Sequence, residues 1–329
     1  MNILFEHKGI LPVKHYGGTE RQIYWIIKRL RQLGHQVWLI GHPLSNVKNL
    51  GVNLIERPST NWSKVIPNNI DIIHIFSKTE EDLNEYPHLI TIGGNGQLGE
   101  IFPLNTVFVS KQHAINHNST SFVNNGIDFD EYPLLNTTKV RKSWEKILFM
   151  AKASWKVKNL KSCVYACRKN RKKLHIVGGR SFFSYFSPYI YSHNQVSQKR
   201  KLEILATSDL YLFPVRWHEP FGITILEAYS QGLAVIGSPY GSLPYLIDKE
   251  TGIICNNEQE LIDVLANDSD LATKFDPEKI REKATTYFTL ERMVDDYIDL
   301  YKKVMRGEKL NETYPSWKLS QSPQTLLSF

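Results

Sequence analysis

Two carboxylates on either side of a glycine are the residues of this 329-residue chain best placed to do chemistry. In "FPVRWHEPFGITILEAYS", Glu219 precedes Phe221 and Gly222, and Glu227 follows within a predicted helix. A helix that begins at a glycine presents unpaired backbone N–H groups, and the missing side chain lets an anion approach them closely. This pattern predicts a site for a diphosphate.

The two glutamates have different expected partners. From Gly222 to Glu227 a helix rises by about 7.5 Å, so Glu227 lies beside a sugar next to the phosphates. There it accepts hydrogen bonds from hydroxyls, as ribose-binding carboxylates do. Glu219 stays at the helix start, on the other side of the diphosphate. The alternative is that Glu219 is only a helix-start charge favoured by the dipole and Glu227 is an exposed helix residue.

The elements that carry these residues alternate between strands and helices. In the first half, the short and almost entirely apolar segments expected to be buried parallel strands are "NILF", "HQVWLIG", "DIIHIF", "HLITIG" and "NTVFVS". The helical spacing of isoleucines and leucines in "TERQIYWIIKRLRQLG" predicts a helix that Thr19 caps and Gly34 ends. The first half is therefore expected to be a Rossmann-like layer with right-handed crossovers.

The alternation restarts after a segment rich in turn formers and charges, "NNGIDFDEYPLLNTTKVRKSW". Strands are expected at "KILFM", "KLHIVGG", "LYLFP", "LAVIG" and "GIIC". We expect an α/β protein with an N-terminal Rossmann-like domain over 1–137, a second doubly wound domain over 138–290, and a C-terminal helix with a loosely held polar tail over 291–329. Ligands bind such sheets at the carboxyl ends of the strands, where "LYLFP" leads into the glutamate-bearing helix.

The net charge of +7 is unevenly distributed, because Lys139 to Lys201 holds seventeen Lys and Arg residues and one acid, Glu145. Within it, "RKNRKK", residues 168–173, is a solvated face or meets an anionic membrane surface or a phosphorylated lipid acceptor. No nucleic-acid partner is expected, since no recognised binding module surrounds the stretch. The aromatic segment "SFFSYFSPYIYSHN", residues 181–194, is local core, a base-stacking loop or a membrane-touching loop.

Cysteine usage and hydropathy indicate the compartment. Cys163, Cys167 and Cys255 lack the spacing of a redox or metal site, so we interpret them as structural thiols in a reducing cytoplasm. No run of about 18 apolar residues spans a bilayer, and the N-terminus lacks the apolar region of a signal peptide. A cytoplasmic protein is expected, with peripheral contact to the inner face of a membrane as a further possibility.

The glutamate-bearing stretch resembles the donor-site signature of glycosyltransferase family 4, the retaining enzymes of the GT-B fold also described as glycosyl transferases group 1. The pattern is E-x-F-G-x4-E-A, matched here by Glu219, Phe221, Gly222, Glu227 and Ala228. Further segments resemble the family in the same order along the chain: "GGTERQIYWIIKRLRQLGHQVWLI", "FVNNGIDFDEY", "KLHIVGG", "ATSDLYLFP" and "FTLERMVDDYIDLYKKV". The last resembles a C-terminal helix that crosses back to the N-terminal domain.

The resemblance implies a basic pair for the donor diphosphate. Its residues fall on Lys152 and Lys158 in "MAKASWKVKNL", with Lys156 as a competitor for the second role. The family usually has Arg at the first position, and Lys there keeps the charge without the bidentate fork.

The resemblance implies backbone contacts as well. Gly17 and Gly18 would bring the N-terminal loop against the diphosphate and the sugar, although paired glycines also mark ordinary turns. The backbone of Gly222 and Ile223 and the hydroxyl of Thr224 would complete the phosphate cradle, and Glu219 would touch hydroxyls of the donor sugar.

One departure from the family concerns a histidine that often follows the strand before the sugar. Here "HLITI" is followed by Gly93-Gly94-Asn95-Gly96. The missing imidazole implies a different donor sugar, with Asn95 as the substitute, or weak activity. His113 is not at the motif position, and we interpret it as structural or solvent-facing.

The expected function is therefore retaining transfer of a sugar, of the hexosyltransferase type, from a nucleotide-diphosphate sugar to a glycan or lipid-linked acceptor in surface polysaccharide or lipopolysaccharide synthesis. We expect no cofactor and no metal, because no acidic cluster follows a strand where it would bridge a diphosphate. The alternative is a degenerate nucleotide-sugar-binding scaffold without turnover.

Overall fold

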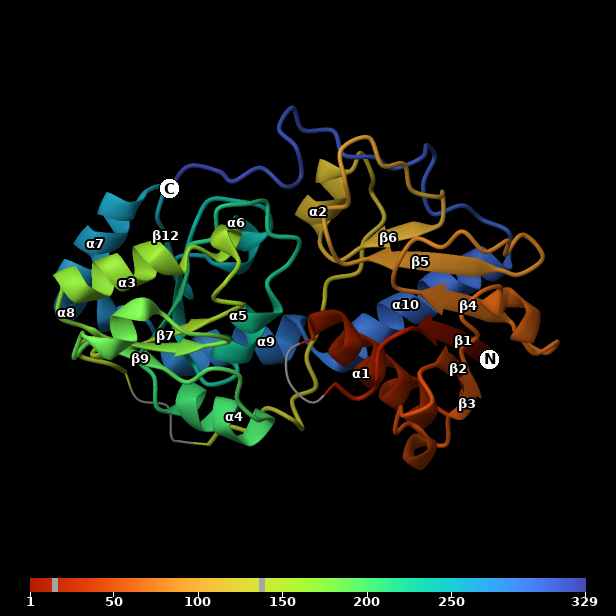
Figure 1. Ribbon diagram of the computed structural model, residues 1–329, viewed down its shortest axis with the longest axis horizontal. Coiled ribbons are helices and arrows are strands. Elements are labelled where there is room, and N and C mark those ends of the chain that lie inside the picture. The colour runs from red at the N-terminus through yellow and green to blue at the C-terminus, as the bar shows by residue number, and fades with distance from the viewer. Residues whose placement is uncertain (14–16, 136–139) are drawn as a thin grey trace. The chain divides into compact units, whose positions relative to one another are not determined.

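The computed structural model describes residues 1–13, 17–135 and 140–329, which form two compact units (Figure 1). Unit 1 comprises Met1–Ile127 and Leu290–Pro323, and unit 2 comprises Asp128–Thr289 and Gln324–Phe329. The predicted domain boundary after residue 137 falls among residues 136–139, which lie outside the described residues. The two units divide between Ile127 and Asp128.

Unit 1 is built on a parallel six-stranded sheet of order β3-β2-β1-β4-β5-β6. Its strands are β1 (Asn2–His7), β2 (Gln36–Gly41), β3 (Asn53–Glu56), β4 (Ile72–Ile75), β5 (His88–Ile92) and β6 (Thr106–Phe108). Its helices are α1 (Gly18–Gln32), α2 (Lys111–Asn116) and α10 (Leu290–Met305), with 3₁₀ turns η1 (Lys48–Leu50) and η2 (Trp62–Val65). All the strands predicted in the first half are present; β3, a half-exposed edge strand, was not predicted.

Of the two residues predicted to bound helix α1, one has the predicted role and the other does not. Its apolar stripe is buried, including Ile23, Ile26 and Leu30. Gly34 adopts a left-handed conformation, φ +83°, directly after the helix, which confirms it as the stop. The predicted cap Thr19 is wrong, because the helix already begins at Gly18 and its N-cap residue is Gly17.

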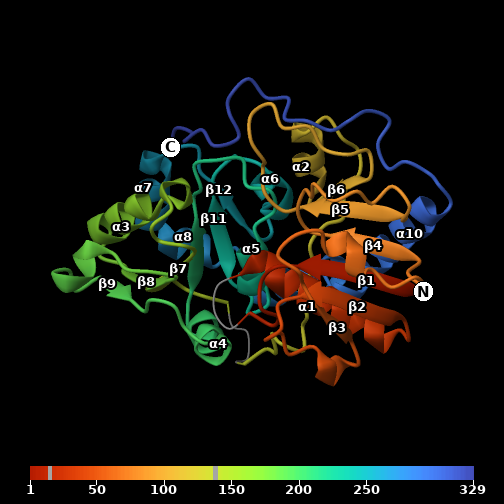
Figure 2. The same ribbon diagram turned by 45° about the vertical axis from the view of Figure 1, so that its right-hand side comes forward.

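Unit 2 has a second parallel sheet, of order β12-β11-β10-β7-β8-β9. Its strands are β7 (Lys146–Met150), β8 (Lys173–Val177), β9 (Ile190–Ser192), β10 (Leu210–Phe213), β11 (Ala234–Gly237) and β12 (Gly252–Ile254), the last two visible side by side in Figure 2. Its helices are α3 (Leu160–Lys169), α4 (Gln198–Ala206), α5 (Ile223–Tyr229), α6 (Leu243–Leu246), α7 (Glu258–Ala266), α8 (Asp268–Ala272) and α9 (Pro277–Tyr287), with 3₁₀ turns η3 (Lys156–Lys158) and η4 (Phe182–Tyr185). The predicted pair of Rossmann-like layers is confirmed.

The C-terminal helix α10 belongs to unit 1, where a buried polar network joins it to the sheet. The Tyr301 hydroxyl lies 2.7 Å from Nδ1 of His74 on β4. Thr91 Oγ1 on β5 lies 2.9 Å from His74 Nε2 and 3.1 Å from the Tyr297 hydroxyl. Because each buried polar group finds a partner on the other element, the network fixes the position of α10 on the sheet.

The segment after Gly307 is also held, so the prediction of a loosely held polar tail is wrong. The Asn311 side-chain amide donates to the backbone carbonyls of Leu104 and Thr106, each at 2.8 Å. Further along, Trp317 is buried. The polar composition of the segment concealed these contacts, since its asparagine pairs with backbone groups of unit 1 instead of water.

The buried His74 makes stability depend on pH. Burial lowers the pKa of His74 well below its usual value, so below about pH 6.5 the unfolded chain binds a proton that the folded chain excludes. The free energy of unfolding is therefore expected to fall as the pH decreases, by up to about 1.4 kcal/mol per pH unit for this one group. Urea unfolding at several pH values measures it. His74→Gln should show a slope smaller by about one proton.

Tyr301→Phe provides the matched control for this pH dependence. It removes the hydroxyl partner and lowers stability by about 1–3 kcal/mol, but it keeps the imidazole and therefore the pH slope. His113 is also buried with a lowered pKa and contributes a slope of its own in every variant. Identical slopes for the wild type and His74→Gln would contradict the assignment to His74.

Candidate functional site

The predicted site residues of unit 2 follow two neighbouring strands, β7 and β10. These strands pair directly, Leu210 opposite Ile147, although they are not consecutive in the chain. The chain builds the sheet outward in opposite directions from this pair, so the loops after the two strands diverge and leave room between them. Lys152 and Lys158 follow β7, and Glu219 follows β10. This is the topological switch point, where open α/β sheets bind their ligands.

A buried ion pair joins the two loops. Lys158 Nζ lies 2.7 Å from Glu219 Oε2, and only 7% and 9% of the two side chains are exposed. The indole N–H of Trp217 donates to the same carboxylate oxygen at 2.6 Å. The Trp217 and Phe213 rings lie 4.9 and 5.0 Å from the ammonium nitrogen. The pair therefore places a positive charge in largely apolar surroundings, where its attraction for an anionic oxygen is strong. Glu219 is thus more than a helix-start charge.

The loop that carries Glu219 is fixed from behind by the turn after β11. The backbone N–H of Ser242 donates to the Glu219 carbonyl at 3.0 Å, and the Ser242 hydroxyl donates to the Phe221 carbonyl at 2.6 Å. Gly241 has φ +64°, and a Cβ there would lie 2.3 Å from the Glu219 carbonyl oxygen. Only glycine fits this close approach. Neither residue was predicted, although a glycine in "SPYGS" is a visible turn signal.

The last residues of the chain also hold this loop. The backbone N–H of Leu327 donates to the Arg216 carbonyl at 2.8 Å, and Arg216 Nε donates back to the Leu327 carbonyl at 2.6 Å. The Tyr240 hydroxyl donates to the Ser328 carbonyl at 2.7 Å. Gln324–Phe329 thus contribute to the positioning of the β10 loop within unit 2.

Helix α5 begins where the sequence predicted. Gly222 is its N-cap residue, with a left-handed backbone at φ +98° that glycine adopts without strain. Phe221 and Gly222 are buried, whereas Ile223 and Thr224 are half-buried in the first turn. Thr224 Oγ1 lies 2.8 Å from the hydroxyl of Tyr211 on β10, and burial raises the pKa of Tyr211 well above its usual value. The side chain of Thr224 is thereby oriented from the sheet.

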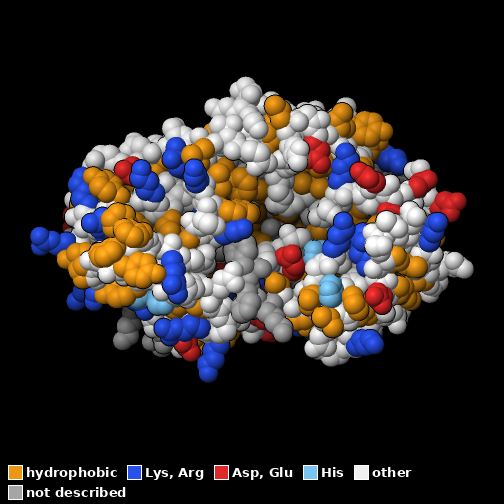
Figure 3. All heavy atoms as spheres, viewed as in Figure 1, with side chains coloured by type: hydrophobic (Ala, Val, Ile, Leu, Met, Phe, Trp, Pro, Cys, Tyr) orange, Lys and Arg blue, Asp and Glu red, His pale blue; other side chains and the backbone are white. Residues whose placement is uncertain are grey.

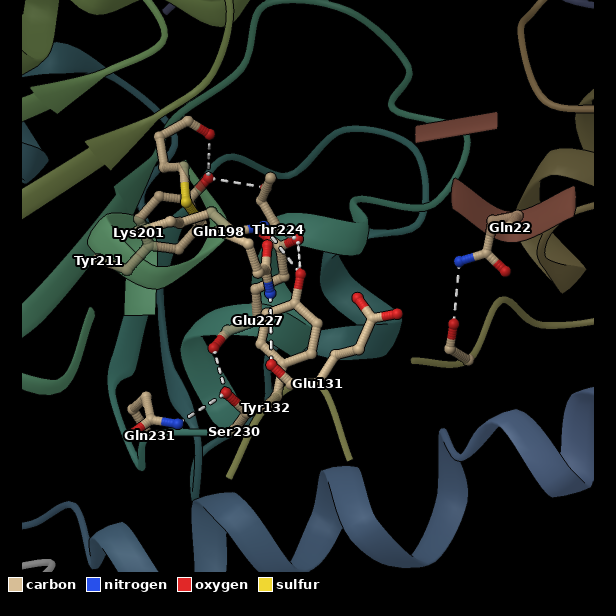
Figure 4. A network of polar contacts seen from close by, with 12 residues as sticks. Gln22, Glu131, Tyr132, Gln198, Lys201, Tyr211, Thr224, Glu227, Ser230 and Gln231 are labelled. Atoms are coloured by element: carbon tan, nitrogen blue, oxygen red, sulfur yellow. Dashed lines mark hydrogen bonds and ion pairs between the residues drawn. The ribbon is translucent and has the colours of Figure 1, made fainter. Parts of the chain in front are cut away.

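Glu227 is buried and paired, which contradicts the alternative of an exposed helix residue. Lys201 Nζ on α4 donates to Glu227 Oε1 at 2.7 Å and to the Tyr132 hydroxyl at 2.8 Å. Tyr132 also donates to Glu227 Oε1 (Figure 4). The Ser230 hydroxyl donates to the Glu227 carbonyl at 2.6 Å. Two donors on one oxygen fix the orientation of the carboxylate. Neither partner was predicted: Lys201 lies outside the recognised segments, and Tyr132 ends "FVNNGIDFDEY" without a role that its type or spacing indicates.

The lysines after β7 differ in their surroundings. Lys152 and Lys156 are exposed, and Lys152 Nζ lies 4.9 Å from the centre of the Trp155 ring. Lys158 is buried against Glu219. The loop of Lys152 is packed closely by the turn after β8, since a Cβ at Gly178 would lie 2.3 Å from the Ala151 carbonyl oxygen. The structure brings Lys158 and Glu219 into contact and leaves the Lys152 side chain in solvent.

The remaining predicted residues lie in unit 1. Gly17 is half-buried before α1 and Gly18 is its exposed first residue, on the segment that follows β1. His113 is buried, Nε2 lies 3.0 Å from the Gly94 carbonyl oxygen, and burial lowers its pKa well below its usual value. His113 is therefore structural. His117, the C-cap residue of α2, has Nε2 3.0 Å from the carbonyl oxygen of the buried Asn95, so His113 and His117 together hold the segment Gly93–Gly96.

No group of three or more His, Cys, Asp or Glu side chains that could hold a metal ion occurs in the described part of the chain. All three cysteines are buried and free. Burial raises the pKa of Cys255 to about 12 and those of Cys163 and Cys167 well above the usual value. Such thiols are unreactive, which agrees with a structural role.

The fold is that of glycosyltransferases of the GT-B type. The chain is similar to AviGT4, a glycosyltransferase involved in avilamycin A biosynthesis, with a TM-score of 0.74 and 15% identity over 96% of this chain and 99% of that one. It is also similar to HepE from Anabaena in complex with UDP and glucose, with a TM-score of 0.66 and 16% identity over 92% of this chain and 100% of that one. These similarities confirm the predicted fold class.

Part of unit 2 is also similar in sequence to a known family. Residues 145–267 match the family model described as glycosyl transferases group 1, which confirms the resemblance for this segment. N-acetyl-alpha-D-glucosaminyl L-malate synthase from Bacillus anthracis is 28% identical over 209 residues, 57% of this chain and 54% of that protein. The chain therefore spans about half the length of this curated relative.

Proposed function

We propose that the protein transfers a sugar from a nucleotide-diphosphate sugar to a hydroxyl of a glycan or lipid-linked acceptor, with retention of configuration at the transferred carbon. The observation that supports this most directly is the Lys158–Glu219 pair at the switch point between β7 and β10. It combines a cation for a leaving diphosphate with a carboxylate for sugar hydroxyls, on a fold and in a segment shared with glycosyltransferases.

Each residue has a role in this proposal. Lys158 and the exposed Lys152 neutralise the diphosphate, aided by the backbone of Gly222 and Ile223 and the hydroxyl of Thr224. Glu219 accepts hydrogen bonds from hydroxyls of the donor sugar, and Trp217 keeps its carboxylate oriented when Lys158 turns toward the phosphate. Glu227 accepts hydrogen bonds from the ribose. The contact of Gly17 and Gly18 with the diphosphate and the transferring sugar, which the resemblance implies, stays a prediction.

The proposed reaction needs no protein nucleophile. The bond between the anomeric carbon and the diphosphate oxygen breaks, and its electron pair goes to the diphosphate. The acceptor hydroxyl oxygen bonds to the same face of that carbon, and its proton goes to the departing diphosphate oxygen. The protein positions the two substrates and stabilises the charge that develops on the leaving group. Lys158 is placed for that stabilisation, and the proposal requires no metal or cofactor.

The setting is part of the proposal as well. None of the helices among the described residues has the length and apolar character required to cross a bilayer. We place the protein in the cytoplasm, with surface polysaccharide or lipopolysaccharide synthesis as the process it serves.

A thermal-shift panel of UDP-, GDP-, ADP- and TDP-sugars tests donor binding. A ligand that binds only the folded state at 100 times its Kd stabilises that state by about 2.7 kcal/mol, which corresponds to a rise in the unfolding midpoint of roughly 5–10 °C for a domain of this size. One nucleotide series is expected to produce this shift, and release of its diphosphate in the presence of acceptor then measures turnover.

The outcomes of the panel separate transferase from scaffold. Stabilisation by one nucleotide with acceptor-dependent release of the diphosphate supports the proposal. Binding without release under any acceptor condition favours the scaffold without turnover. The absence of a shift with every donor, in a sample that unfolds cooperatively, contradicts a preformed donor site in unit 2.

A further inference from the structure

A cluster of exposed aromatic side chains occupies the edge of unit 2. Turn η4 and the residue after it carry Phe182, Phe183, Tyr185 and Phe186. Phe182 is 71% and Phe186 72% exposed, so the interpretation of this segment as local core is wrong. Phe182 packs against its neighbour Phe186 with ring centres 5.1 Å apart. Exposing such a cluster to water costs free energy, and exposed apolar clusters of this kind mark surfaces that bind a partner.

The aromatic cluster continues onto the exposed face of α3. Lys161, Tyr165, Arg168 and Lys169 are the exposed positions of this helix, at a spacing that places them on one side. The Arg168 guanidinium lies 4.2 Å from the centre of the Phe183 ring, which joins the helix to the turn. Figure 3 shows hydrophobic side chains gathered over the region that Figure 1 labels α3 and β9, bordered by Lys and Arg.

The charged side chains of the chain segment that forms this surface are all positive. Residues 146–202 contain fourteen Lys and Arg residues and neither Asp nor Glu. Arg180 lies at the start of the turn and is within 3.3 Å of the Tyr185 hydroxyl. Acidic residues lie on α7, which packs against α3 and carries Glu258, Glu260 and Asp263, and Lys172 just after α3 pairs with Glu145 and Asp268. The aromatic turn itself therefore has basic flanks.

We infer that this aromatic-basic surface, formed by η4, Phe186 and the exposed face of α3, docks onto an anionic lipid bilayer. Phenylalanine and tyrosine rings favour the interface between water and hydrocarbon. Lysine and arginine side chains at the edge of such a patch lay their methylene groups on it and reach the phosphates with their charged ends. Each basic residue near an anionic leaflet adds to the attraction.

The position of the surface favours a bilayer over a nucleobase as its occupant. The 3₁₀ turn leads to β9, which is the edge strand of the sheet, whereas the donor-site residues follow the central pair β7 and β10. Two strands, β7 and β8, thus lie between β9 and β10 in the sheet order. The inference concerns a surface apart from the donor site, and it does not depend on the proposed transfer.

Sedimentation of the full chain with lipid vesicles tests the inference. The wild type is expected to bind vesicles of phosphatidylcholine with phosphatidylglycerol and to bind pure phosphatidylcholine much less. Phe182→Ser/Phe186→Ser should weaken binding to the mixed vesicles by about tenfold or more, because two rings no longer enter the interface. Lys161→Ala/Lys169→Ala should weaken binding to the mixed vesicles only, and added salt should mimic it.

The matched control is Tyr287→Ser/Tyr314→Ser, which removes two exposed aromatic side chains elsewhere. It is expected to bind the mixed vesicles as the wild type does. Equal binding of the mixed vesicles by Phe182→Ser/Phe186→Ser and Tyr287→Ser/Tyr314→Ser overturns the inference. No binding of the wild type to the mixed vesicles overturns it as well. So does a wild-type dimer in light scattering that Phe182→Ser/Phe186→Ser converts to a monomer, because a second copy would then cover the surface. Unchanged donor-induced thermal shifts in all variants keep this test separate from that of the donor site.

Discussion

Lys158→Met is expected to lower the rate of sugar transfer by about 100- to 1000-fold, the effect of removing one preorganised group that stabilises developing charge. The ammonium of Lys158 is buried, paired with Glu219 and next to the Trp217 ring, so its attraction for a leaving diphosphate is little screened by water. Lys156→Met is the matched control two residues earlier on η3. Because Lys156 is exposed, that change should leave the rate within about twofold. Steady-state release of the nucleoside diphosphate measures both.

Loss of stability has to be separated from loss of chemistry in this experiment. Removing Lys158 alone leaves the buried Glu219 carboxylate without its cation, which costs about 3–5 kcal/mol of folding free energy. Lys158→Met/Glu219→Gln removes both charges and keeps the side-chain volumes close to those of the wild type. It should recover much of the unfolding midpoint while remaining as slow as the single variant or slower. Recovery of both stability and rate would show that Lys158 only supports the fold, and a slow Lys156→Met variant would transfer its role to Lys156.

How far the fold follows from the sequence depends on burial. The central strands were predicted because strands buried on both faces are continuous apolar runs, as in "KILFM" and "LYLFP". Of the four edge strands, β3 and β9 were not predicted because they carry exposed residues, whereas the short β6 and β12 were predicted from their apolar runs. Thr19 has the side chain of a cap, but the chain enters α1 two residues earlier through glycines. The capping preference of Thr19 is therefore overridden by the tertiary structure, which starts the helix at Gly18.

The residues of the candidate site also fall into those that the sequence predicted and those that it did not. Glu219, Gly222 and Glu227 were found because their spacing is local and because a strand leads into them. Lys201 and Tyr132 were not found, since they lie 26 and 95 residues from Glu227 and meet it only in the folded unit. The spacing of residues in the sequence does not indicate a contact between residues so far apart in the chain. Trp217 lies in the motif loop, but its donation to Glu219 depends on the turn that Gly241 and Ser242 support.

Glu227→Gln is expected to raise the Kd for the nucleoside diphosphate by about 10- to 100-fold, the loss of hydrogen bonds to a charged acceptor. The carboxylate oxygens accept from both ribose hydroxyls in the proposed complex, whereas an amide offers one oxygen and a donor that opposes a hydroxyl. Tyr132→Phe is the matched control, because it removes a donor to Glu227 Oε1 and leaves the carboxylate in place. Its Kd should rise by only a few fold. Isothermal titration of each variant gives these values.

A 2′-deoxynucleoside diphosphate distinguishes recognition of the ribose from support of the fold. The wild type should bind the deoxy ligand more weakly than the ribose form, because Glu227 loses one of its partners. In Glu227→Gln this difference should largely disappear, since a partner already lost is not lost again. A merely structural Glu227, held by Lys201 and Tyr132 to anchor α5, would weaken both ligands equally and preserve the difference. The coupling between the 2′-hydroxyl and the carboxylate therefore decides the role of Glu227, whatever the change in stability.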